Sequence, residues 1–179
     1  MATDIQIHAQ DQAVNKALKR LMRSMPQGGD GTPAMKAVGR VLLTGVQLRL
    51  RAQKGPDGTP WKPSKRAINE GGATLRDSGL MRDSFSIDAS SNKVAVGTNS
   101  VKAAIHQFGG TIKHPGGTRY VLIDGLAKFV ANSLVGPVSG VTKAHPIPMP
   151  ARPMLGDSDA DRKEILDVLE RHYRKGWAG

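Results

Sequence analysis

The side chains best suited to chemistry in this sequence are its histidines, serines and acids, and their spacing argues against an active site. His106, His114 and His145 would have to converge to hold a metal ion, and no helical histidine–carboxylate pair accompanies them. The serines lack the Gly-x-Ser-x-Gly turn that exposes a nucleophile. We therefore predict no metal site and no catalytic residue, and we interpret His106 as a partly buried polar side chain.

Asp157, Asp159 and Asp161 alternate as the acids of a calcium loop do. That loop also requires a glycine at its sixth position and a glutamate at its twelfth, and both are missing here. Acids at the start of a helix offset the positive end of its dipole, which explains these residues better. The pairs Gly71-Gly72 and Gly116-Gly117 lack the residues that complete a phosphate-binding loop. No cofactor is expected, and the chain is predicted not to be an enzyme.

Basic residues are the remaining feature that could do chemistry. The 26 Lys and Arg exceed the 15 Asp and Glu to give a net charge of +11, mostly within residues 1–82. Such charge favours contact with a polyanion such as nucleic acid, or a solvated surface that meets an acidic protein. No aromatic platform accompanies it, which argues against binding single strands by stacking. The candidate contacts to DNA or an acidic partner are Lys16, Lys19, Arg20, Arg23, Arg40 and Arg51.

Three amphipathic helices would position most of these residues. Apolar side chains recur at intervals of three and four over residues 10–25, 32–53 and 158–174. Thr32 is the predicted N-cap of the second helix, with Pro33 at its first helical position. Ser158 and Asp161 resemble a capping box at the start of the third.

Short strands are predicted between the helices. Residues 84–89 and 93–96 flank a polar turn and predict a β-hairpin, and residues 100–107 predict a brief helix. Prolines and glycines make residues 54–63 a shaped loop, anchored on the domain by Trp61. Aromatic residues are only 4% of the chain, so the core is modest. The predicted fold is α+β, a small antiparallel sheet packed against two or three long helices in a single domain of residues 1–179.

Two short phrases, Ile105–Gly110 and Pro150–Gly156, bracket residues 111–149. Each places bulky apolar side chains beside glycine or proline, a combination that sets the direction of the chain at a junction. Strand-like pieces between the phrases predict an inserted β-hairpin arm that projects from the domain and contacts other subunits. The predicted anchors are Phe108 and Leu155 in the core, Gly109 and Gly110 at the exit, Pro153 at the return, and Arg152 in an ion pair or on a carbonyl group.

The sequence contains no cysteine, which excludes disulfides and thiolate metal sites. No stretch approaches the roughly 20 apolar residues that a membrane helix requires, and no signal-peptide pattern opens the chain. We expect a soluble protein without membrane contact.

Four phrases, taken in order, resemble the phage virion morphogenesis family, which includes Mu G-like and tail-completion S-like proteins. The first is similar to the family's P-D-G-x-x-W-x-P loop, and the second to its L-x-x-S-G-x-L-x-x-S turn, with Met81 at the usual leucine position. Met154 stands where the family usually has phenylalanine, and Lys102 and Ala103 stand where relatives often have a tyrosine. The phrases are Pro56–Pro63, Leu75–Ser84, Val96–Gly110 and Ile147–Gly156.

The resemblance implies a non-enzymatic virion component, assembled in the host cytoplasm, that completes the tail or joins it to the head. It implies a homo-oligomeric ring, six- or twelve-fold, that contacts other neck, portal-side and tail-terminator proteins. Such a ring would enclose genomic DNA, where sequence-neutral positive charge is useful. Two alternatives stay open: a basic, sequence-neutral DNA-binding protein that acts outside any particle, and a transient tail-assembly chaperone.

Overall fold

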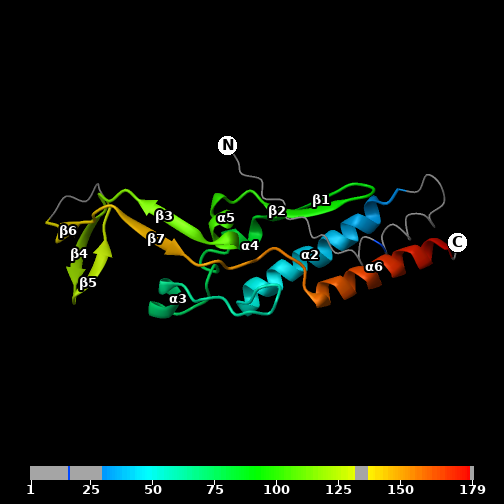
Figure 1. Cartoon of the computed structure of the whole chain (residues 1–179), viewed down its shortest axis with the longest axis horizontal. Coiled ribbons are helices and arrows are strands. Elements are labelled where there is room, and N and C mark those ends of the chain that lie inside the picture. The colour runs from blue at the N-terminus through cyan, green and yellow to red at the C-terminus, as the bar shows by residue number, and fades with distance from the viewer. Residues whose placement is uncertain (1–15, 17–29, 132–136, 178–179) are drawn as a thin grey trace. The chain divides into compact units, whose positions relative to one another are not determined.

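A computed structural model describes residue 16, residues 30–131 and residues 137–177 of the chain (Figure 1). Contacts within the chain divide it into two compact units. Unit 1 comprises residues 1–108 and 151–179, and unit 2 comprises residues 109–150. Each unit is described by itself below.

Two long helices form the frame of unit 1. Helix α2 (Thr32–Ala52) packs side by side with α6 (Asp159–Trp177) and also against the hairpin of β1 (Phe85–Ala89) and β2 (Val94–Thr98) (Figure 1). The hairpin is antiparallel, with Phe85 opposite Thr98. Three short helices complete the described part of unit 1: α3 (Lys65–Asn69), α4 (Leu80–Asp83) and α5 (Val101–Phe108).

The two long helices differ in how their N-termini are capped. At α2 the predicted cap is wrong by one residue: the N-cap is Gly31, and Thr32 is already helical, so Pro33 is the second helical residue and not the first. The Asp30 carboxylate accepts a hydrogen bond from the backbone N–H of Thr32 at 2.9 Å. Pro33 occupies the first turn, where a missing N–H costs nothing. At α6 the capping box is confirmed, because Ser158 Oγ accepts from Asp161 N and Asp161 Oδ2 accepts from Ser158 N.

The core of unit 1 consists of two clusters of buried apolar side chains. The first joins α2 to the loops and to α5, and the second joins α2 to α6. Large apolar burial of this kind is the main favourable term in folding. The first cluster contains Val46, Leu50, Trp61, Phe85, Ala103, Met154 and Leu155, and the second contains Ala34, Met35, Val38, Ile165 and Leu169.

A buried ion pair lies between the two clusters. Arg49 of α2 bonds to Asp161 of α6, and its second guanidinium nitrogen donates to the Met154 carbonyl at 3.2 Å. Gly45 makes room for this pair, because a Cβ there would come within 2.5 Å of Asp161 Oδ1. The pair therefore ties α2 to both the start of α6 and the loop that precedes it.

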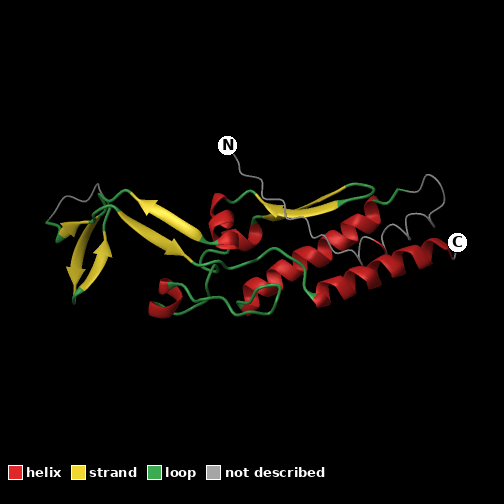
Figure 2. Ribbon diagram, in the orientation of Figure 1, coloured by secondary structure: helices red, strands yellow, loops and turns green. Residues whose placement is uncertain are grey.

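The described part of unit 2 contains strands and loops, whereas helices are confined to unit 1 (Figure 2). Strands β3 (Gly110–His114) and β7 (His145–Met149) pair antiparallel as a two-stranded ribbon. Beyond the ribbon, β4 (Arg119–Ile123) lies between β5 (Leu126–Phe129) and the short β6 (Gly140–Val141). None of the side chains whose exposure is described in unit 2 is buried.

The α+β class is confirmed, and a small antiparallel sheet, β1–β2, packs against a long helix as predicted. The described strands as a whole form three separate sheets, one in unit 1 and two in unit 2. The predicted helix over residues 10–25 lies outside the described residues except for Lys16, which is helical. The smaller unit, residues 109–150, differs by one or two residues at each end from the predicted insertion at 111–149. Its projection as an arm stays a prediction.

Candidate assembly site

The parts of the two phrases that belong to unit 1 are joined by hydrogen bonds between residues 106–107 and 152–155. Gln107, at the end of α5, donates from Nε2 to the Leu155 carbonyl at 3.0 Å. Its Oε1 accepts from the backbone N–H groups of Met154 and Leu155 at 2.8 and 3.0 Å. The neighbouring carbonyl of His106 accepts from Arg152 N at 2.6 Å. The chain thus leaves unit 1 and returns to it at one hydrogen-bonded junction.

Arg152 is a structural residue of this junction. Its side chain is buried, and Nε donates to the Lys62 carbonyl at 2.9 Å, so its partner is a carbonyl group, one of the two predicted kinds. Burial lowers the pKa of Arg152. The bond holds the loop of residues 54–63, whose Trp61 is also buried. The Trp61 indole nitrogen has no hydrogen-bond partner in the described part of the chain.

The same loop carries its own internal hydrogen bonds. Gly55 N donates to the Thr59 carbonyl at 2.8 Å, and Trp61 N donates to the Gln53 carbonyl at the end of α2. The Thr59 hydroxyl and amide both donate to the Asp57 carboxylate, which lowers the pKa of Asp57. These bonds explain the Pro-Asp-Gly-Thr-Pro spacing as a preformed turn that presents Trp61 to the core.

The prediction for Phe108 is wrong. Its side chain is 65% exposed, because Ala103 and Gln107 occupy the inner side of the short helix α5 and Phe108 follows about 100° further round. Leu155 is buried, and its neighbour Met154 is fully buried in the position where the family usually has phenylalanine. Pro153 is half-buried.

Gly109 and Gly110 have φ values of 71° and 144°, which residues with a Cβ rarely adopt. They allow the chain to turn from α5 directly into β3. The role predicted for them at the exit is consistent with this geometry.

His106 is half-buried, and its Nδ1 has no partner in the described part of the chain. Burial, followed by the charges of Arg152 and Lys102, lowers the pKa of His106 below its ordinary value. Within the described residues no three His, Cys, Asp or Glu side chains are grouped to hold a metal ion. The helices in the same part of the chain are not long and apolar enough to cross a membrane.

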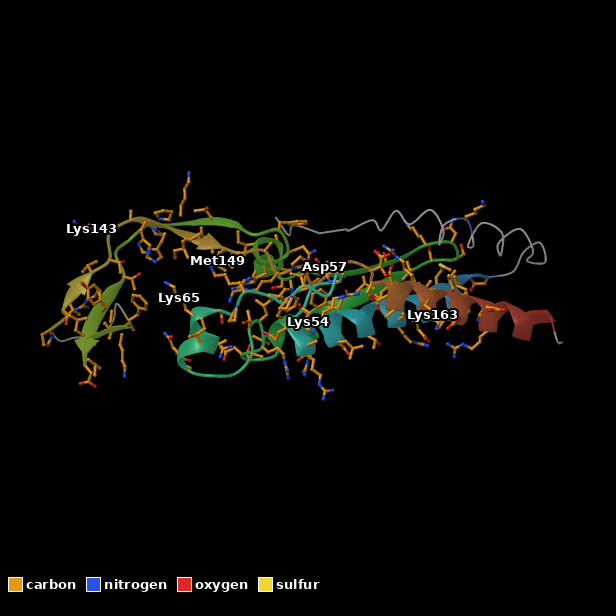
Figure 3. The ribbon with its side chains drawn as sticks, turned by 60° about the horizontal axis from the view of Figure 1, so that its bottom comes forward. Lys54, Asp57, Lys65, Lys143, Met149 and Lys163 are labelled. Carbon is orange, nitrogen blue, oxygen red and sulfur yellow. The ribbon has the colours of Figure 1, made fainter. Side chains whose placement is uncertain are left out.

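Only three of the six basic residues predicted to bind DNA or an acidic partner lie among the described residues. Lys16, Arg40 and Arg51 are exposed, and Lys19, Arg20 and Arg23 lie outside the described residues. In Figure 3 the labelled Lys54, Lys65 and Lys163 come from three separate segments of unit 1, and all three are exposed. The structure instead brings Arg51 close to two arginines that the sequence did not single out.

An arginine-lined depression of about 250 Å³ opens on unit 1 beside the second half of α2. Arg51 comes from α2, Arg76 from the following turn and Arg82 from α4. The exposed side chain of Leu48 forms part of its floor. Sequence reasoning missed Arg76 and Arg82 because they lie in a turn and a one-turn helix, where no periodic pattern predicts which way a side chain points. The full lining is Thr44, Gln47, Leu48, Leu50, Arg51, Arg76 and Arg82.

Unit 2 exposes apolar side chains on both faces of its three-stranded sheet. The register places Tyr120 opposite Phe129 and Leu122 opposite Ala127, so these four share one face, and none of them is charged. Leu122 and Phe129 are 55% and 69% exposed. The other face carries Arg119 and Lys128 among Val121, Ile123 and Val141.

The model of the phage virion morphogenesis family matches residues 9–174, nearly the whole chain. No curated protein and no solved structure matches it significantly. The match covers the preformed Trp61 loop, the junction and unit 2 alike. The chain therefore belongs to the phage virion morphogenesis family and has a structural role in the phage virion.

Proposed function

We propose that the chain is a ring-forming subunit that completes the phage tail or joins it to the head. The observation that carries this proposal is the exposure of unit 2. Its described side chains include five large apolar ones more than 40% exposed, and none of them is buried. A sheet of two or three strands without a covered apolar face is marginal in water. Neighbouring subunits would cover this surface in an assembly.

The partners follow from the same proposal. The chain forms a homo-oligomeric ring, six- or twelve-fold, that meets other neck, portal-side and tail-terminator proteins. Its role is structural and not enzymatic. Genomic DNA passes through the ring and meets the positive charge without base-specific contacts. The net charge of +11 supports this last point.

The proposal is tested on purified phage particles and on a phage that lacks the gene. We expect the protein to remain in the particles after density-gradient purification and to form a ring at the head-proximal end of the tail. Without the gene, heads and unjoined tails should accumulate. Normal joined particles formed without the protein would contradict the proposal. Its absence from particles, together with defective tails, would favour a transient assembly chaperone.

A second candidate function is sequence-neutral DNA binding outside any particle, favoured by the net charge and by the exposed Arg40 and Arg51. Binding through phosphates loses about 10³–10⁵ in affinity between 50 and 200 mM salt when six to ten phosphates are contacted. The affinity of the free protein for duplex DNA, measured over that range, tests this function. A flat salt dependence rules it out.

A further inference from the structure

The arginine-lined depression carries positive charge that the described part of the chain does not neutralise. Arg82 is held by Asp83, with bonds of 2.7 and 3.1 Å. Arg51 and Arg76 have no carboxylate within ion-pair distance among the described residues. Beside them Leu48 is 57% exposed. A ligand for this surface therefore needs an acid next to an apolar side chain.

The outer side of α6 offers that combination. Leu166 is 37% exposed, and the neighbouring Asp167 is exposed, its carboxylate without an ion-pair partner among the described residues. Glu164, one turn earlier, is already paired with Arg171 at 2.9 Å. Leu166 and Asp167 thus form a small acidic and apolar surface that complements the depression.

Neither the arginine-lined depression nor the surface formed by Leu166 and Asp167 is part of the contact between α2 and α6. Ile165 and Leu169 are buried against α2, and successive helical residues are rotated by about 100°, so Leu166 points elsewhere. On α2, Arg49 is buried toward Asp161, while Leu48 and Arg51 face the depression. The depression of one copy is therefore not filled by its own Leu166 and Asp167.

We propose that Leu166 and Asp167 of one copy bind in the arginine-lined depression of the next copy. Leu166 packs on Leu48, and Asp167 pairs with the guanidinium groups of Arg51 and Arg76. The contact joins two different surfaces, so it repeats head to tail and closes into a ring when the rotation between copies permits. This inference rests on the proposed ring and specifies one of its subunit contacts.

The lining favours a protein surface over a nucleic acid. Leu48 and Leu50 form part of the depression, and one of its three arginines is already neutralised by Asp83. A DNA backbone would supply phosphates, but its sugars offer only a small apolar surface to cover Leu48. Arginine forks bind carboxylates in paired hydrogen bonds, as the contact with Asp167 requires.

Cysteine crosslinking tests the contact directly, because the chain has no cysteine of its own. Leu48→Cys and Leu166→Cys are purified as separate full-length variants, mixed at increasing concentration and oxidised. We expect a disulfide-linked dimer that contains one of each, and a ladder of longer species from the variant that carries both substitutions. Leu166→Cys mixed with Val101→Cys, at a residue that is 80% exposed, is the control and should give no mixed dimer. If Leu48→Cys and Leu166→Cys form no crosslink in either the free or the assembled protein, the proposed contact is wrong.

An exchange of charges tests this contact independently of whether the chain forms a ring. Arg51→Glu should weaken self-association by about tenfold or more, and Asp167→Arg in the same chain should restore part of it. Lys36→Glu, the same change of charge fifteen residues earlier on α2, is the matched control and should leave association unchanged. A ring that forms equally well with Arg51→Glu leaves the proposed function standing and rejects this contact. Loss of DNA affinity with Arg51→Glu, at unchanged association, would make the depression a phosphate site.

Discussion

Units 1 and 2 of the chain differ in the interactions that stabilise each of them internally. Unit 1 buries two apolar clusters and an ion pair between its two long helices. Unit 2, over its described side chains, buries none and relies on the backbone ladders of two small sheets. The difference indicates that unit 1 has its own core, whereas the described part of unit 2 has none. In the proposed assembly, neighbouring subunits would cover the exposed side chains of unit 2.

The two-stranded ribbon of β3 and β7 in unit 2 also restricts which of its edges could pair with a further strand. Pro146 and Pro148 of β7 lie opposite Lys113 and Thr111 of β3. Prolines have no N–H, so the β7 donors in this ladder belong to the alternating residues, and the outer edge of β7 lacks donors at both prolines. Proline at an edge opposes strand-to-strand aggregation. A strand added to this ribbon would therefore pair with the edge of β3 and not with that of β7.

Breaking the buried ion pair should show the largest effect and should be confined to unit 1. Arg49→Ala leaves Asp161 buried without its cation, which we expect to lower the free energy of unfolding by about 3–5 kcal/mol. Lys128→Ala, on the exposed sheet of unit 2, should change it by less than about 0.5 kcal/mol. Urea denaturation followed by circular dichroism measures both. Equal effects would remove the contrast between the units.

Truncating one apolar side chain in each unit sharpens the comparison. Leu50 is fully buried, so Leu50→Ala should cost about 2–5 kcal/mol of stability. Phe129 is 69% exposed, so Phe129→Ala should leave stability within about 0.5 kcal/mol but reduce incorporation into particles. Thermal unfolding and the amount of protein in purified particles are the two readouts. A large loss of stability with Phe129→Ala would show that unit 2 has a core of its own.

Only part of the difference between the two units could be predicted from the sequence. Helical periodicity predicted α2 and α6, and the spacing of Ser158 and Asp161 predicted the cap, because both signals are local. Glycine and proline at Gly109, Gly110 and Pro150 predicted where the chain changes direction. The α+β class followed from these elements.

Features that depend on tertiary packing could not be predicted in the same way. The burial of Arg49 and the clamp made by Gln107 require partners more than 40 residues away. Phe108 was expected inside because it is large and apolar, but the register of a helix of eight residues turned it outward. Arg76 and Arg82 join the depression through turns that no periodic pattern describes.

Removing the Gln107 clamp should have an intermediate effect. Gln107→Ala leaves two buried N–H groups and a carbonyl of Met154 and Leu155 without their partner, at a cost of about 1–3 kcal/mol. Gln47→Ala, an exposed change of the same kind on α2, should cost less than about 0.5 kcal/mol. Chemical denaturation compares the two variants. A Gln107→Ala protein as stable as Gln47→Ala would show that the junction does not depend on the clamp.

The smallest effect expected is a dependence of stability on pH through His106. Its pKa in the folded protein is lowered by burial and by the charges of Arg152 and Lys102, so the unfolded chain binds the proton more readily. The contribution of His106 to stability is therefore complete above the unfolded pKa of about 6.5 and is lost as the pH falls toward the folded value. Melting temperatures at several pH values between 5 and 8 should fall more steeply at low pH in the wild type than in His106→Gln. Identical slopes would contradict this role.

Hydrogen exchange followed by mass spectrometry, on the free protein and on assembled particles, tests the central claim most directly. We expect α2 and α6 to be protected in both states. The amides of β4 and β5 should exchange fast in the free protein and slowly after assembly, because neighbouring subunits then cover their sheet. Protection of β4 and β5 equal to that of α2 in the free protein, or fast exchange that persists in the particle, would contradict the account.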